Sequence, residues 1–134
     1  MNLNKVQLIG RLTRDPEMRT TQSGQLVASV SLATNRTWSD KSGAKQEKTE
    51  FHNIVVWGKL ADVVAQYLVK GQIAYFEGRL ETRSFTGKDG VERKSTEIVA
   101  ESMQLGQRPA NSPKTQPTPQ NEDTGEVRIE DVPF

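Results

Sequence analysis

Apolar and polar side chains alternate along five stretches of the chain, which is the pattern of strands that bury one face. The stretches are residues 5–13, 26–34, 49–59, 72–84 and 93–105. After the third stretch, apolar residues instead recur three and four positions apart from Leu60 to Leu68. This spacing predicts a helix of about three turns over residues 59–70, with Gly71 as its stop signal.

Three strands, a helix and two strands predict an all-β fold. This order is typical of a five-stranded, partly open barrel of the oligonucleotide-binding (OB) type, with the helix between strands 3 and 4. Between these elements, residues 14–25 carry turn signals, and residues 85–91 form a hairpin tip with an Asp-Gly turn. Residues 35–48 are expected to be a polar loop in which Trp38 is the only large apolar side chain.

The third stretch places its two aromatic rings, Phe51 and Trp57, on one face, and His52, Ile54 and Val56 on the other. Six residues of extended chain separate the two rings by about 20 Å. Flat rings at this spacing suit two roles, either the stacking of unpaired bases or ordinary packing in the core. The strand pattern alone leaves both interpretations open.

Two further aromatic residues have polar surroundings. Trp38 lies in the charged loop, and Phe85 lies at the shoulder of the hairpin between Arg83 and Lys88. Such neighbours favour contact with solvent or a ligand over burial in a core. For Trp38, packing back onto the domain remains the alternative.

The length of 134 residues suffices for one domain with its own core. Residues 1–106 hold 15 Lys and Arg against 12 Asp and Glu, whereas residues 107–134 hold 3 against 5, together with five of the six prolines. A segment so poor in apolar side chains cannot offset its ordering entropy by burial. We expect a folded domain at 1–106, a disordered linker at 107–125 and an acidic tip at 126–134.

The composition excludes several kinds of site. The chain has no Cys and a single His, which excludes disulfides, thiolate metal sites and His-rich metal sites. Neither GxxxxGK[ST] nor GxGxxG occurs, so we expect no cofactor and no enzymatic activity. The first residues contain no apolar run long enough for a signal peptide or a membrane span, and a cytoplasmic protein without membrane partners is the simplest expectation.

Four segments together form a recognisable pattern. They are NKVQLIGRLTRDPE, SLATNRTW, TEFHNIVVWGKLADVVAQYLVKGQIAYFEGRLETRSF and the terminal EDVPF. On these segments the chain resembles the bacterial single-stranded DNA-binding protein (SSB) family, over residues 2–105 almost continuously and over the final five. The resemblance implies a homotetramer of OB barrels that wraps single-stranded DNA.

The resemblance also implies roles for particular residues. Four stacking aromatics map onto Trp38, Phe51, Trp57 and Phe85; the best-known form of the pattern has Trp in place of both phenylalanines and Phe in place of Trp57. His52 maps near a subunit contact. The acidic end implies a docking peptide for replication, recombination and repair enzymes, made of Glu130, Asp131, Val132, Pro133 and Phe134. Binding to chromosomal DNA would place the protein at the nucleoid.

The predicted function is sequence-independent binding and protection of single-stranded DNA. Stacking tolerates every base, and cations neutralise the phosphates. The candidate cations are Lys5, Arg11, Arg36, Lys59, Arg79, Arg83 and Lys88. Three other classes stay open on the residues alone: a carboxylate-based metal-dependent nuclease, a protein-only adaptor, and an RNA-binding barrel of the same fold.

Overall fold

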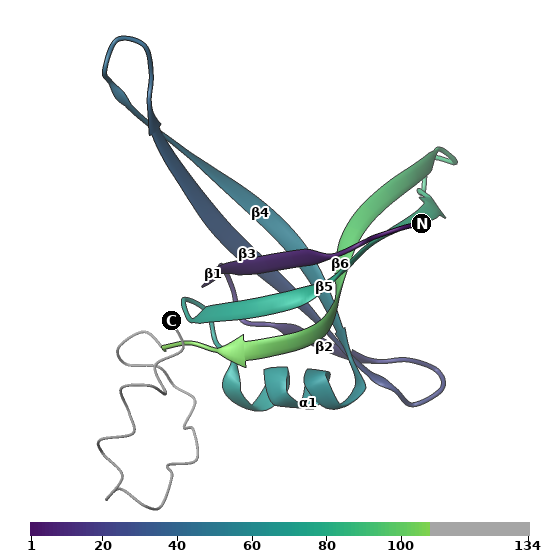
Figure 1. Ribbon diagram of the computed structural model, residues 1–134. Coiled ribbons are helices and arrows are strands. Elements are labelled where there is room, and N and C mark those ends of the chain that lie inside the picture. Colours follow the sequence, from purple (N-terminus) through teal and green to yellow (C-terminus); the bar gives the residue numbers. More distant parts are fainter. Residues whose placement is uncertain (108–134) are drawn as a thin grey trace, which may run out of the picture.

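The computed structural model describes residues 1–107, which form six strands and one helix (Figure 1). The strands are β1 (Val6–Leu12), β2 (Glu17–Thr20), β3 (Leu26–Ser39), β4 (Lys45–Trp57), β5 (Ile73–Thr86) and β6 (Glu92–Leu105), and the helix is α1 (Gly58–Tyr67). The expected acidic tip and all but the first residue of the expected linker lie outside the described residues.

Five of the strands close into a barrel in the order β1-β5-β6-β4-β3. β3 completes the ring by pairing with β1 at Arg11 and Leu12, and β4 runs parallel to β6 around Ile54 and Val55. The remaining neighbours in the barrel pair antiparallel. The predicted all-β OB barrel is confirmed, with α1 between the third and fourth of its five barrel strands (Figure 1).

The interior of the barrel is apolar, and α1 covers one end of it (Figure 1). Leu32, Ile54 and Phe76 are each no more than 1% exposed, and Ala61 and Val64 of the helix belong to the same cluster. Burying a large apolar side chain stabilises a fold by about 1.5–3 kcal/mol relative to leaving it exposed. This core therefore holds the strands whose outer faces meet solvent.

The prediction of a polar loop at residues 35–48 is wrong. The β3–β4 ladder continues without a shift from Phe51 to Lys45, and only residues 40–44 make the connection. There the Asp40 carboxylate accepts hydrogen bonds from the Ser42 hydroxyl at 2.6 Å and the Ala44 N–H at 3.0 Å, which hold the pKa of Asp40 below its ordinary value. We call residues 35–49 the β3–β4 arm; because solvent surrounds both of its faces, its sequence shows no alternation.

Two smaller corrections concern β2 and the end of the helix. The turn region at residues 14–25 contains β2, which pairs with β3 from Glu17 to Thr20. All four residues of β2 are exposed, so there was no buried face for a pattern to reveal. The helix ends at Tyr67, because Leu68 already has extended backbone angles of φ −91° and ψ 137°.

The ends of β5 and β6 project beyond the barrel as a second ribbon (Figure 1). We call residues 81–97 the β5–β6 arm. Leu80, expected to face the core, is 49% exposed at the point where this ribbon leaves the barrel. A shift of register between Glu77 and Gly78 precedes it, so the two strands bend there.

Candidate nucleic-acid interface

The two aromatic rings of β4 lie on the outer face of the barrel. Phe51 is 67% exposed and Trp57 41% exposed, while Ile54 and Val56 on the opposite face are buried. Successive strand residues point to opposite faces, so this difference follows from the alternation that the sequence predicts. In the isolated chain neither ring is part of the core.

Phe85 shares that outer face, although it comes from another strand. The parallel register aligns Val55 of β4 with Val99 of β6, and the antiparallel β5–β6 ladder continues from Val99 to the Arg93–Phe85 pair without a further shift. Phe85 is 41% exposed. The structure therefore brings Phe51, Trp57 and Phe85 onto one continuous sheet face.

Trp38 lies on the other side of the β3–β4 ribbon. Its partner across the ladder is Gln46, whereas Phe51 is opposite Ala33, and residues an odd number of positions apart face opposite sides. The guanidinium of Arg36 stacks on the Trp38 ring at 4.7 Å, and the Trp is 36% exposed. The structure therefore does not place Trp38 on the sheet face of the other three rings.

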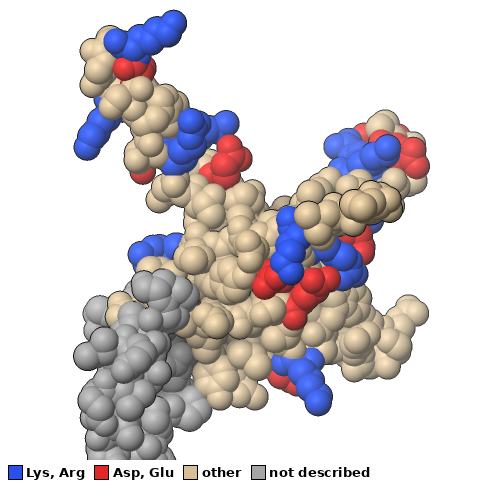
Figure 2. Space-filling view, viewed as in Figure 1, with Lys and Arg blue, Asp and Glu red and all other residues tan. Residues whose placement is uncertain are grey.

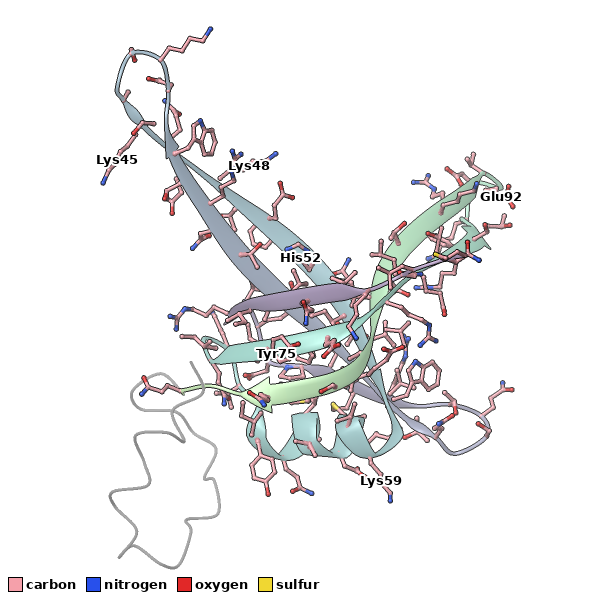
Figure 3. All side chains as sticks on the ribbon, viewed as in Figure 1. Lys45, Lys48, His52, Lys59, Tyr75 and Glu92 are labelled. Carbon is pink, nitrogen blue, oxygen red and sulfur yellow. The ribbon has the colours of Figure 1, made fainter. Side chains whose placement is uncertain are left out.

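Lys and Arg side chains lie along both arms, with Asp and Glu side chains among them (Figure 2). Lys45 and Lys48 lie along the β3–β4 arm, and Lys59 lies in the first turn of α1 (Figure 3). On the β5–β6 arm, the Arg83 guanidinium lies 5.7 Å from the centre of the Phe85 ring. This places one predicted cation directly beside a predicted stacking ring, as cation–π contact requires.

Three other predicted cations have acceptors elsewhere on the outer surface. Arg11 donates to the Gly71 carbonyl at 2.7 Å, and Arg79 pairs with Glu101 at 3.2 Å. Lys5 forms an ion pair with Glu77 that joins β1 to β5. The structure thus ties these three cations to the barrel, while Arg36 and Arg83 lie beside aromatic rings.

The Lys5–Glu77 pair shifts the titration of both partners. The hydrogen bond and the charge of Glu77 raise the pKa of Lys5 above its ordinary value. The hydrogen bonds from Lys5 and from the Tyr75 hydroxyl lower the pKa of Glu77, and Tyr75 is 3.0 Å from the Glu77 carboxylate. The neighbouring strands β1 and β5 are thereby linked by charge as well as by their ladder.

Between the aromatic rings lies a groove of about 260 Å³ that the sequence did not indicate. It is lined by side chains from β2, β3, β4, β5 and β6 and from the turn before β2, including Arg14, Asn53, Arg83, Ser95 and Glu97. These residues are far apart in the sequence and share no motif. The pairing of β2 with β3, of β3 with β4, of β4 with β6 and of β5 with β6 brings them together.

His52 lies on the inward side of β4, where its Nε2 is 2.9 Å from the Thr34 hydroxyl, and Figure 3 shows it at the base of the β3–β4 arm.

Among the described residues no group of three or more His, Cys, Asp or Glu is arranged to hold a metal ion. No helix in residues 1–107 is long and apolar enough to cross a membrane.

Residues 3–106 match the model of the single-strand binding protein family. The single-stranded DNA-binding protein of Neisseria meningitidis serogroup A is 51% identical over 113 residues, which are 84% of this chain and 65% of that protein. Single-stranded DNA-binding protein 1 of Chlorobaculum tepidum is 55% identical over 104 residues, which are 77% of this chain and 64% of that protein. The match thus spans just under two thirds of the length of both relatives.

A solved structure, the Plasmodium falciparum SSB in complex with ssDNA, has the same fold. It superposes with a TM-score of 0.70 at 35% sequence identity and covers 78% of this chain and 94% of that one. The barrel fold, the exposed rings on its outer face and the similarity to these relatives all point to the same family. The chain belongs to the single-strand binding protein family.

Proposed function

We propose that this protein binds single-stranded DNA without regard to sequence and protects it. The observation that carries the proposal is the exposure of Phe51, Trp57 and Phe85 on one outer sheet face. Exposed aromatic side chains are costly in an isolated domain, and several on one face mark a binding surface. The names of the relatives support the same ligand.

The proposed selectivity for single strands over duplex DNA rests on the exposed faces of unpaired bases. Stacking of a base on an aromatic ring contributes about 1–3 kcal/mol and accepts all bases, because each base has a π-face. Duplex DNA hides these faces, so it retains only phosphate contacts with Arg and Lys. Cations of the two arms, such as Arg36 and Arg83, would supply those contacts beside the rings.

Competition between DNA forms tests this proposal. A labelled single-stranded oligonucleotide bound to the full chain is challenged with unlabelled single strand or with duplex of the same sequence, at low and at high salt. We expect the single strand to compete far better, and its advantage to grow with salt as phosphate contacts weaken. Equal competition by duplex at both salt concentrations would reject the proposal.

We also propose that the protein is a homotetramer. β1 pairs along its length with β5 but meets β3 only at Arg11 and Leu12, and Ile9 on its outer face is 51% exposed. A second copy covering this strand would satisfy the open edge and bury Ile9, with His52 near a subunit contact. Light scattering should give four chains for the wild type and fewer for Ile9→Asp; any number other than four for the wild type would contradict the proposal.

The C-terminal tip is proposed to recruit replication, recombination and repair enzymes at the nucleoid. Glu130 and Asp131 stand beside Val132 and Phe134 at the end of the chain, which combines charge with an apolar anchor for a partner's pocket. Deleting Phe134 should abolish retention of such enzymes on immobilised protein while leaving DNA binding unchanged. Undiminished retention would place the docking site elsewhere.

A further inference from the structure

One side of the β3–β4 arm carries two cations at directly opposite positions. Arg36 of β3 is aligned with Lys48 of β4 in the antiparallel ladder, so both side chains lie on the same side of the ribbon. Like charges in this arrangement repel each other and destabilise a pair of strands. What each cation contacts therefore shows how the arm tolerates both.

The two cations have partners in opposite directions along the arm. The Lys48 ammonium pairs with Glu50 at 3.2 Å, two residues nearer the barrel. The Arg36 guanidinium instead lies over the Trp38 ring, 4.7 Å from its centre and two residues nearer the tip. Among residues 1–107 no carboxylate pairs with Arg36, so the indole ring is the contact that holds it.

The turn at the tip does not compete for Arg36. Asp40 is the first acid after Trp38 in the chain, but its carboxylate is occupied within the turn. It accepts hydrogen bonds from the Ser42 hydroxyl at 2.6 Å and from the Gln46 side chain at 3.1 Å. Gln46 is the ladder partner of Trp38, so the same network also fixes the residue beside the ring.

The β5–β6 arm has the same spacing with a different balance of contacts. Arg83 also precedes its ring, Phe85, by two residues, but its guanidinium lies 5.7 Å from the ring centre. Glu97 accepts a hydrogen bond from Arg83 at 3.1 Å. Arg36 is closer to its ring and has no such carboxylate, so the Arg36–Trp38 contact is the one in which cation and ring hold each other.

We infer that Arg36 is a positioning residue that presents Trp38 to one unpaired base. The guanidinium covers one face of the indole, so a base stacks on the opposite face. A ring that is already held loses less freedom when the base arrives, which favours binding. A guanidinium can stack through its flat face while its N–H groups donate in the plane, so positioning is compatible with a phosphate contact. The inference rests on the proposed function and adds to it a role for Arg36 in stacking.

Charge and positioning separate in a comparison of Arg36→Gln with Lys48→Gln. Each variant removes one positive charge from the same side of the arm, so each should lower the salt dependence of oligo(dT) binding by at most about one counterion. At high salt, where phosphate contacts contribute little, Lys48→Gln should bind as tightly as the wild type. Arg36→Gln should still bind about two- to fivefold more weakly, as expected for loss of an exposed cation–π contact.

The conservative variant Arg36→Lys refines the comparison. Lysine keeps the positive charge but has no planar group to stack on the indole. Arg36→Lys should therefore restore the wild-type salt dependence and only part of the affinity at high salt.

A spectroscopic measurement reports on the ring itself. In a Trp57→Phe background Trp38 is the remaining tryptophan of the chain, and its fluorescence anisotropy decay measures how freely the ring moves before DNA is added. Arg36→Gln should add a fast component to this decay, because the contact that holds the ring is gone. Lys48→Gln should leave the decay unchanged.

Three results would overturn the positioning role while the proposed function stands. They are equal affinities of Arg36→Gln and Lys48→Gln at high salt, an unchanged anisotropy decay for Arg36→Gln, and a Trp38→Leu variant that binds oligo(dT) as tightly as the wild type. Failure of the wild type to bind oligo(dT) rejects the proposed function and the inference with it.

Discussion

Side chains on β4 divide between the barrel interior and solvent at neighbouring positions. Ile54 and Val56 are at most 1% exposed, whereas Phe51 is 67% exposed. Leaving apolar area in water forgoes about 25 cal/mol for each Å², so an exposed Phe does little for the stability of the isolated chain. Stacking on an unpaired base, as proposed, would give this exposed ring its role.

Two substitutions at Phe51 distinguish stacking on a flat ring from simple apolar contact. Phe51→Leu keeps an apolar side chain but removes the π-face, and we expect it to weaken single-strand binding by about 1–3 kcal/mol. Phe51→Tyr keeps the ring and should bind within a few-fold of the wild type. Because the side chain is 67% exposed, neither change should alter thermal unfolding much. Leu binding as tightly as Tyr, in a fluorescence anisotropy titration, would show that stacking is not involved.

The Lys5–Glu77 pair predicts a dependence of stability on pH. The pKa of Glu77 is lowered from 4.5 in the folded chain, so its contribution is present above 4.5 and is lost as the pH falls through the folded pKa. The pKa of Lys5 is raised from 10.5, so its contribution is present below 10.5 and is lost as the pH rises through the folded value. Near neutral pH both contributions are complete.

Glu77→Gln should therefore lower the melting temperature at neutral pH, by a small amount because the pair is partly solvated. The difference from wild type should shrink as the pH falls below 4.5 and vanish once the pH is below the lowered pKa of the folded Glu77 carboxylate. Glu47→Gln, on the β3–β4 arm, is the control and should follow the wild type. A melting temperature of Glu77→Gln equal to that of wild type at neutral pH would contradict a stabilising pair.

At the scale of the element, the β5–β6 pair depends on a close approach of two backbones. A Cβ atom at Gly78 would stand 2.0 Å from the Val99 carbonyl oxygen, next to the register shift between Glu77 and Gly78. Backbone atoms cannot move aside as the end of a side chain can. Gly78 therefore permits the bend from which the β5–β6 arm leaves the barrel.

Gly78→Ala should destabilise the fold by about 1–3 kcal/mol, as overpacking does, or prevent the barrel from closing. Gly87→Ala is the matched control in the same hairpin: its Cβ would meet the Asp89 carboxylate at 2.9 Å, which is the end of a side chain and can move. Urea unfolding should show a clearly lower midpoint for Gly78→Ala only. Equal midpoints for the two variants would mean that the close approach is not required.

The barrel was predictable because its strands each bury one face, and the resulting alternation is visible in residues such as Ile54 and Val56. The β3–β4 arm and β2 were not predictable, because strands that are exposed on both faces show no alternation of apolar and polar residues. The side of the ribbon on which Trp38 lies follows from the continuation of β3 to Ser39, which the sequence did not predict. Asn53 comes level with Glu97 only through the pairing of β4 with β6. Local patterns thus predict which residues share a face of a strand, while the exposure of that face and the groove on it require the assembled molecule.

For the whole molecule, the central claim is that exposed aromatic rings bind the bases of single-stranded DNA. Trp38 and Trp57 are the two tryptophans of the chain and are 36% and 41% exposed, so intrinsic fluorescence reports on the claim directly. The measurement is a titration with oligo(dT), with a duplex control, at low and high salt. If bases stack on these rings, the single strand alone should quench the fluorescence strongly, and the quenching should persist at high salt. Weak quenching, or equal binding of duplex that disappears with salt, would show that phosphate contacts account for binding and would contradict it.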